Sequence, residues 1–108
     1  MKIQELINNG FDILALPDPE KEIKGVYIGD LLSWVMGKAN ANDAWVTIMS
    51  NLNVIAVASL TDVASVILAE GVIPDGEIIE TAKEKGVNLL VCPLPSYETA
   101  IKLSELLK

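Results

Sequence analysis

The sequence predicts an α/β protein in which a mainly parallel sheet of about five strands lies between two layers of helices. From residue 44 onward, short apolar segments alternate with segments of helical periodicity, which is the pattern of right-handed β-α-β units. Glycine, proline and asparagine separate these segments, so that the connections are short. The 108 residues, 51% of them hydrophobic, suit one domain over residues 1–108 with a buried core.

The amino-terminal segment predicts a short helix followed by a strand. Ile3, Leu6 and Ile7 have the i, i+3, i+4 spacing of one helix face, and an Asn-Gly pair follows them as a stop signal. Phe11–Leu16 alternates between apolar and polar residues and then meets Pro17, which is typical of a strand that ends at a turn. A polar loop leads on to the next element.

The second unit is predicted as strand, helix and strand. Gly25–Gly29 forms a strand, after which Asp30 can cap a helix over Leu31–Met36. Gly37 closes this helix, and a further strand follows at Ala44–Met49.

The apolar stretch in the middle of the chain admits two interpretations. Val54–Ala58 can be a buried strand followed by a helix at Thr61–Ala69, or a helix can span Leu52–Asp62 and precede a strand at Ala64–Ala69. Periodicity does not decide between them for so short a run. We prefer the second interpretation, because it continues the strand-helix alternation with short connections.

The last third predicts a helix, a buried strand and a final helix. Asp75 and Glu77 stand in the first turn of a helix that Gly86 stops. Val87–Cys92 is almost entirely apolar, as strands of parallel sheets are. Two prolines end that strand, and Tyr97–Leu107 forms an amphipathic helix.

The composition excludes several classes of function. The eight basic residues are all lysines, and the chain contains neither histidine nor arginine, so histidine catalysis and bidentate arginine contacts are absent. The net charge is −7 and the lysines are scattered, which argues against nucleic acids and anionic membranes as partners. Cys92 is the only cysteine, and its apolar surroundings in sequence predict an inert buried thiol.

Motifs for catalysis, cofactors and targeting are also missing. The glycines form neither a dinucleotide fingerprint nor a P-loop, and no EF-hand spacing occurs. We therefore predict no catalytic residues, no metal site and no cofactor. The start of the chain lacks the apolar run of a signal peptide, and the longest apolar stretch is too short for a membrane span, so we expect a cytoplasmic protein.

The candidate ligand site lies where the predicted strands end. In parallel sheets, ligands bind outside the carboxyl ends of the strands. Small and polar residues gather at these ends, namely Gly29, Asp30, Ser50, Asn51, Asn53, Glu70 and Gly71. The structural alternatives are that Asp30 merely caps a helix and that residues 50–53 form an ordinary capped turn.

One predicted helix is apolar on almost every side. Leu31, Trp34, Val35 and Met36 belong to it, and such a helix is either buried in its own fold or covered by another subunit. These four residues are our candidate homodimer interface. Trp45, on a predicted strand, is expected in the core.

Five segments, taken in order, resemble the DRTGG domain, which occurs between other domains in some phosphate acetyltransferases and CBS-containing pyrophosphatases. The likeness extends from about Gly25 to Leu107 and is carried by Val26-Tyr27-Ile28-Gly29-Asp30-Leu31-Leu32, Asp43-Ala44-Trp45-Val46-Thr47-Ile48, Asn53-Val54-Ile55-Ala56-Val57-Ala58, Val66-Ile67-Leu68-Ala69-Glu70-Gly71 and Cys92-Pro93-Leu94-Pro95-Ser96-Tyr97-Glu98-Thr99-Ala100. The DRTGG domain is related to the amino-terminal domain of HPr kinase/phosphorylase, so the resemblance implies that fold.

The resemblance implies a non-catalytic regulatory or ligand-sensing module that forms homodimers. The chain is most similar to short stand-alone members, which are encoded near iron hydrogenase components or histidine-kinase-like ATPases. The alternative is therefore an adaptor for a redox or kinase-type protein partner. Many relatives carry Thr-Gly-Gly where this chain has Ala69-Glu70-Gly71, and a carboxylate there would repel a phosphate.

Overall fold

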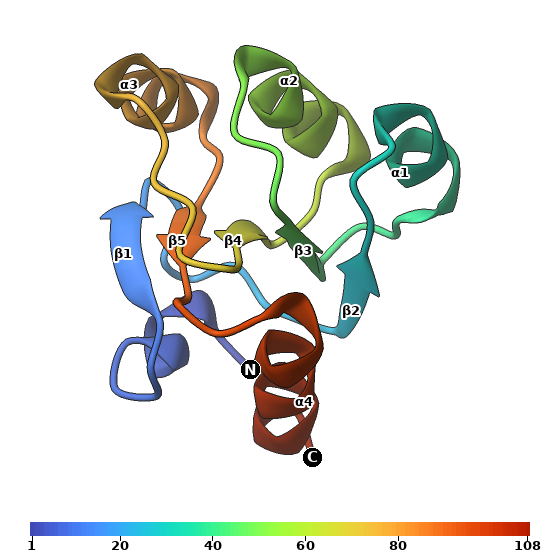
Figure 1. The fold of residues 1–108 in the computed structure, drawn as a ribbon, viewed down its shortest axis with the longest axis vertical. Helices are drawn as coiled ribbons and strands as arrows, with labels where there is room; N and C mark the ends of the chain where they lie inside the picture. The colour runs from blue at the N-terminus through green and yellow to red at the C-terminus, as the bar shows by residue number, and fades with distance from the viewer.

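The computed structural model describes residues 1–108 and shows an α/β fold with five strands, four α-helices and one short 3₁₀ helix (Figure 1). In chain order the elements are η1 (Ile3–Leu6), β1 (Asp12–Ala15), β2 (Gly25–Ile28), α1 (Leu32–Lys38), β3 (Asp43–Thr47), α2 (Leu52–Thr61), β4 (Ser65–Leu68), α3 (Gly76–Lys85), β5 (Leu89–Val91) and α4 (Ser96–Leu106).

The sheet is mixed and mostly parallel, as predicted. Its strand order is β1-β5-β4-β3-β2, and β2 to β5 all run in the same direction. The strand β1 pairs antiparallel with β5, and the register between them shifts between Ile13 and Ala15. The two edges of the sheet are therefore β1 and β2.

Helices cover both faces of this sheet. Figure 1 shows α1, α2 and α3 side by side over one face, with η1 and α4 on the other. Alternation along the strands separates the side chains accordingly. Trp45 and Val66 belong to the buried cluster beneath α1–α3, whereas Val46 and Ile67 belong to the cluster that includes Leu103 of α4.

The ambiguous central segment folds as we preferred, with a helix followed by a strand. In α2 the buried positions include Val54, Ile55 and Ala58, which pack on the sheet. The side chain of Asn51 caps this helix by accepting a hydrogen bond from the backbone N–H of Asn53 at 3.0 Å. All four residues of β4 are buried between β3 and β5, so the apolar character of both segments is satisfied.

Three local predictions were wrong. Gly37 lies inside α1 and does not close it, since the helix continues to Lys38. The first helix is a four-residue 3₁₀ segment, and Ile7 lies beyond it with its side chain exposed, so the predicted helical stripe does not continue. The helix α1 begins at Leu32, and its N-cap residue is Leu31 in an extended conformation without a side-chain capping bond. Asp30 therefore does not cap α1.

None of the helices has the length and apolar character that a membrane span requires.

Candidate functional site

A crevice opens at the carboxyl end of β3, between the first turns of α2 and α3. The chain leaves β3 and enters α2 directly, and α3 packs beside α2, so that both helices begin at this place. The crevice has a volume of about 630 Å³. It is lined by Ile48, Met49, Ser50, Asn51, Leu52, Asn53, Asp75 and Ile78.

The structure thus brings together three of the seven predicted ligand-site residues, Ser50, Asn51 and Asn53. Their convergence follows from their closeness in the sequence at one strand end. Asp75 completes the lining from α3 and was not among the predicted ligand residues. Its position after Pro74 at a helix start was visible in the sequence, but which strand end it would face depends on how α3 packs.

The lining combines hydrogen-bonding groups with an apolar floor. Asn51 uses its side-chain oxygen for the helix cap, which leaves its amide N–H groups to donate. Asn53 and Ser50 add further polar atoms, while buried Ile78 contributes apolar surface. No lysine lines the crevice, and the carboxylate of Asp75 opposes a negative charge there. This chemistry suits an uncharged polar group with an apolar face.

Gly29 and Asp30 lie apart from this lining and fasten the β2–α1 connection to β3. The indole N–H of Trp45 donates to the carbonyl of Gly29 at 2.8 Å. The carboxylate Oδ1 of Asp30 accepts from the hydroxyl of Thr47 at 2.7 Å and from the backbone N–H of Ile48 at 3.0 Å. Because Ile48 lines the crevice, Asp30 supports the wall of the site from behind.

The space beside Gly29 is taken by the side chain of its near neighbour Tyr27. A Cβ atom at this position would lie 2.9 Å from Cε2 of Tyr27, closer than real Cβ contacts. A side chain here would therefore displace the ring of Tyr27.

Glu70 and Gly71 form a left-handed turn just after β4 and not in the crevice. Their φ angles are +62° and +74°. Near this turn, the connections that follow β4 and β5 leave toward opposite faces of the sheet. The chain passes from β4 to α3 on one face but from β5 to α4 on the other (Figure 1). Such a divergence between neighbouring parallel strands is a common ligand position.

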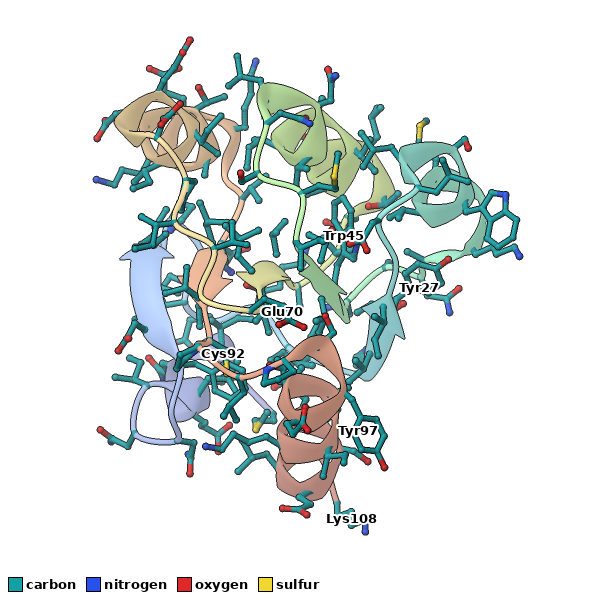
Figure 2. The ribbon with its side chains drawn as sticks, viewed as in Figure 1. Tyr27, Trp45, Glu70, Cys92, Tyr97 and Lys108 are labelled. Carbon is teal, nitrogen blue, oxygen red and sulfur yellow. The ribbon has the colours of Figure 1, made fainter.

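In this fold the carboxylate of Glu70 occupies that position itself. Its Oε2 accepts the backbone N–H of Ser96 at the start of α4, at 3.2 Å, and its own N–H donates to the carbonyl of Leu94 at 2.8 Å. Figure 2 shows Glu70 between the sheet and the nearer end of α4. A negative charge at the amino end of a helix is stabilising, and it repels a second anion at the same place.

Gly71 and Cys92 line a smaller cavity of about 190 Å³. Cys92 is fully buried in the apolar cluster on the α4 face, which confirms its prediction as a buried thiol. Trp45 is likewise fully buried, as predicted.

The predicted interface helix divides between surface and core. Leu31, Trp34 and Met36 are more than half exposed, and Lys38 Nζ lies 4.1 Å from the ring centroid of Trp34. Val35 is 0% exposed and packs in the core beneath α1–α3, so its assignment to the interface is corrected. One side of a short helix must face the sheet, and Val35 occupies it.

Comparison with known proteins identifies the fold. No family model matches the chain, and no curated protein matches it. A solved structure does, the CBS and DRTGG domains of the regulatory region of Clostridium perfringens pyrophosphatase, complexed with its activator, diadenosine tetraphosphate. The TM-score is 0.70 at 19% sequence identity, over 94% of this chain and 45% of that one. The chain thus spans less than half of that structure, and the likeness supports a DRTGG-like fold.

Proposed function

We propose that this protein is a non-catalytic regulatory module that senses a small molecule in the crevice at the carboxyl end of β3. The observation that carries the proposal is the convergence of Ser50, Asn51 and Asn53 with Asp75 around an open volume of about 630 Å³. Clefts of this size with a few polar groups over an apolar floor are typical of small-molecule sites.

The fold likeness supports the regulatory part of the proposal, because the similar structure is a regulatory region in complex with an activator. That activator contains adenosine groups joined by phosphates. In this chain the crevice lacks basic residues and contains Asp75, so we expect it to take the nucleoside part of such a ligand and to leave phosphates in solvent.

Isothermal titration with adenosine, ATP and diadenosine tetraphosphate tests this proposal. We expect all three to bind, with adenosine at least as tight as ATP. Asn53→Ala removes a lining side chain but keeps the backbone N–H that Asn51 caps, so binding should weaken at least about fivefold while the fold remains.

Asn40→Ala is the matched control, since Asn40 is exposed and does not line the crevice. It should bind like the wild type. Failure of all three compounds to bind, or equal weakening by both variants, would contradict this site.

A second candidate function, a protein-interaction adaptor, is favoured by the exposed apolar side chains of α1. Trp34 is 58% and Met36 53% exposed on this short helix, and Leu31 just before it is 57% exposed, so the three form an exposed apolar patch. The partner would be a redox, hydrogenase-associated or kinase-type protein. Under this function Trp34→Ser abolishes binding of such a partner, and the compounds above do not bind.

Three further expectations belong to the proposal. The module is a single DRTGG-like domain over residues 1–108, works in the cytoplasm, and acts as a homodimer. The surface that would form this homodimer is argued next.

A further inference from the structure

The strand β2 is a short edge of the sheet that carries no charged residue, proline or bulge. Natural edges are protected by charged residues, prolines or bulges. The other edge, β1, carries Asp12 and an irregular register. By contrast, β2 has the sequence Gly-Val-Tyr-Ile and an uninterrupted parallel register with β3.

The backbone of β2 offers free hydrogen-bonding groups at this edge. The N–H of Gly29 donates to the carbonyl of Val46 on β3 at 3.1 Å. Because the groups of successive residues point to opposite sides of a strand, Tyr27 also bonds toward β3. The N–H and C=O groups of Val26 and Ile28 therefore face away from the sheet.

Apolar side chains flank these groups. A groove of about 560 Å³ runs between β2 and α4, lined by Val26, Tyr27, Ile28, Ala100, Ser104, Leu107 and Lys108. Ile28 is 49% exposed, and Tyr97 of α4 is 72% exposed. Figure 2 shows Tyr27 between β2 and α1, and Tyr97 on α4 beyond the other face of the sheet.

We propose that a second copy of this chain covers this surface by pairing its own β2 antiparallel to the first. This inference rests on the dimeric part of the proposed function and not on the crevice. The two-fold axis passes Tyr27, so that Val26 exchanges hydrogen bonds with Ile28 of the partner subunit. The result is one continuous sheet of two joined halves.

Charge favours a second copy as the occupant. Lys24 stands just before β2 and Asp30 shortly after it, and β2 itself is uncharged. In the antiparallel register, Lys24 lies near Asp30 of the partner subunit at each end of the joined strands, so opposite charges approach one another there, while Oδ1 of Asp30 stays on Thr47 and Ile48 of β3. A second copy of this chain provides a strand with a lysine before it and an aspartate after it, which is the order that an antiparallel partner of β2 needs.

Light scattering coupled to size exclusion tests the pairing. The wild type should have twice the chain mass of 11.6 kDa. Ile28→Lys places a charge on the half-exposed edge and should give the single-chain mass. Ile73→Lys is the matched control, because Ile73 is 84% exposed on the β4–α3 connection, and it should stay dimeric. A monomeric wild type, or a dimeric Ile28→Lys protein, would overturn the inference.

Disulfide trapping tests the register without disturbing the edge by charge. Tyr27 faces Tyr27 of the partner subunit in a non-hydrogen-bonded pair, where Cα atoms are about 4.5 Å apart, within disulfide range. Tyr27→Cys should therefore form a cross-linked dimer under mild oxidation. Ile28→Cys should not, since two such residues would be separated by roughly 8 Å or more.

The wild type is the blank for this experiment, because its only thiol, Cys92, is buried. Cross-linking of Ile28→Cys in preference to Tyr27→Cys would overturn the register. Adenosine titration of the wild type keeps the two proposals apart. If the wild type is monomeric and binds adenosine, only the pairing through β2 fails. If it is dimeric and does not bind adenosine, only the crevice proposal fails.

Discussion

At the scale of single residues, Asp30 shows how a polar residue at a strand end can serve the fold and the site together. Its carboxylate holds the Thr47 hydroxyl and the Ile48 N–H, and Ile48 lines the crevice. The sequence allowed two roles for Asp30, ligand contact or helix cap. The structure gives Asp30 a third role, which is to bind the end of the neighbouring strand β3. The spacing of residues near Asp30 in the sequence could not predict this contact, because it depends on which strand lies beside β2.

Removing this carboxylate should destabilise the protein. Asp30→Ala loses two hydrogen bonds to a charged acceptor, so the free energy of unfolding should fall by about 2–3 kcal/mol. Asp30→Asn retains an acceptor oxygen and should recover part of this loss. Urea denaturation measures both effects. Asp18→Ala is the control, because only the backbone of Asp18 forms hydrogen bonds, and it should change stability by less than about 0.5 kcal/mol.

Cys92 should be unreactive until the protein unfolds. The thiol is fully buried in an apolar cluster, so a thiol reagent such as dithionitrobenzoate should modify it only at the rate of opening. Reaction within seconds in native buffer would contradict this burial.

Cys92→Ser places a hydroxyl there and should lower the free energy of unfolding by about 1–3 kcal/mol.

At the scale of elements, α1 separates what composition can predict from what it cannot. Its apolar residues predicted a helix with no obvious polar side, and the structure shows Val35 buried and Trp34 exposed. When almost every residue of a helix is apolar, the residue that faces the sheet is determined by the position at which the helix begins. That start is Leu32 rather than the predicted Leu31, because Asp30 is engaged with β3 and does not cap the helix.

Substitutions in α1 should divide in the same way. Val35→Ala leaves a cavity in the core and should lower the free energy of unfolding by roughly 2 kcal/mol. Trp34→Ala removes an exposed ring, so the change should be below about 0.5 kcal/mol. Thermal or urea unfolding of the two variants side by side measures the difference. A larger effect of Trp34→Ala would show that another surface covers this ring.

At the scale of the whole molecule, the alternation of elements predicted the layers and the parallel strands but not the strand order. The same succession of strands and helices fits several orders, since each strand can add to either edge of a growing sheet. The strand β2 is an edge because it pairs only with β3, while β1 pairs with β5 at the opposite end of the sheet. The predicted ligand-site residues separate in the structure for the same reason, because strand order decides which strand ends lie together. Residues 50–53 were close in the chain and stayed together, whereas Glu70 lies at another strand end, where its carboxylate binds Ser96 of α4.

The thermal stability of the assembled protein should depend on its concentration. If folding and pairing through β2 are linked, raising the protein concentration favours the folded dimer and raises the melting temperature. Ile28→Lys, which blocks the edge, should melt at a temperature that does not change with concentration. A scanning fluorimetry series over a hundredfold range of concentration distinguishes the two behaviours. If the melting temperatures of both proteins stay constant over this range, folding and pairing through β2 are not linked.

The antiparallel pair of β1 and β5 also sets the order in which the chain can fold. These strands come from opposite ends of the sequence, so β1 finds its neighbour only after nearly all the other elements have been synthesised. Contacts between residues so distant in the chain form slowly. During synthesis, the segment around Ile13 and Leu14 therefore has no strand partner until β5 has been made.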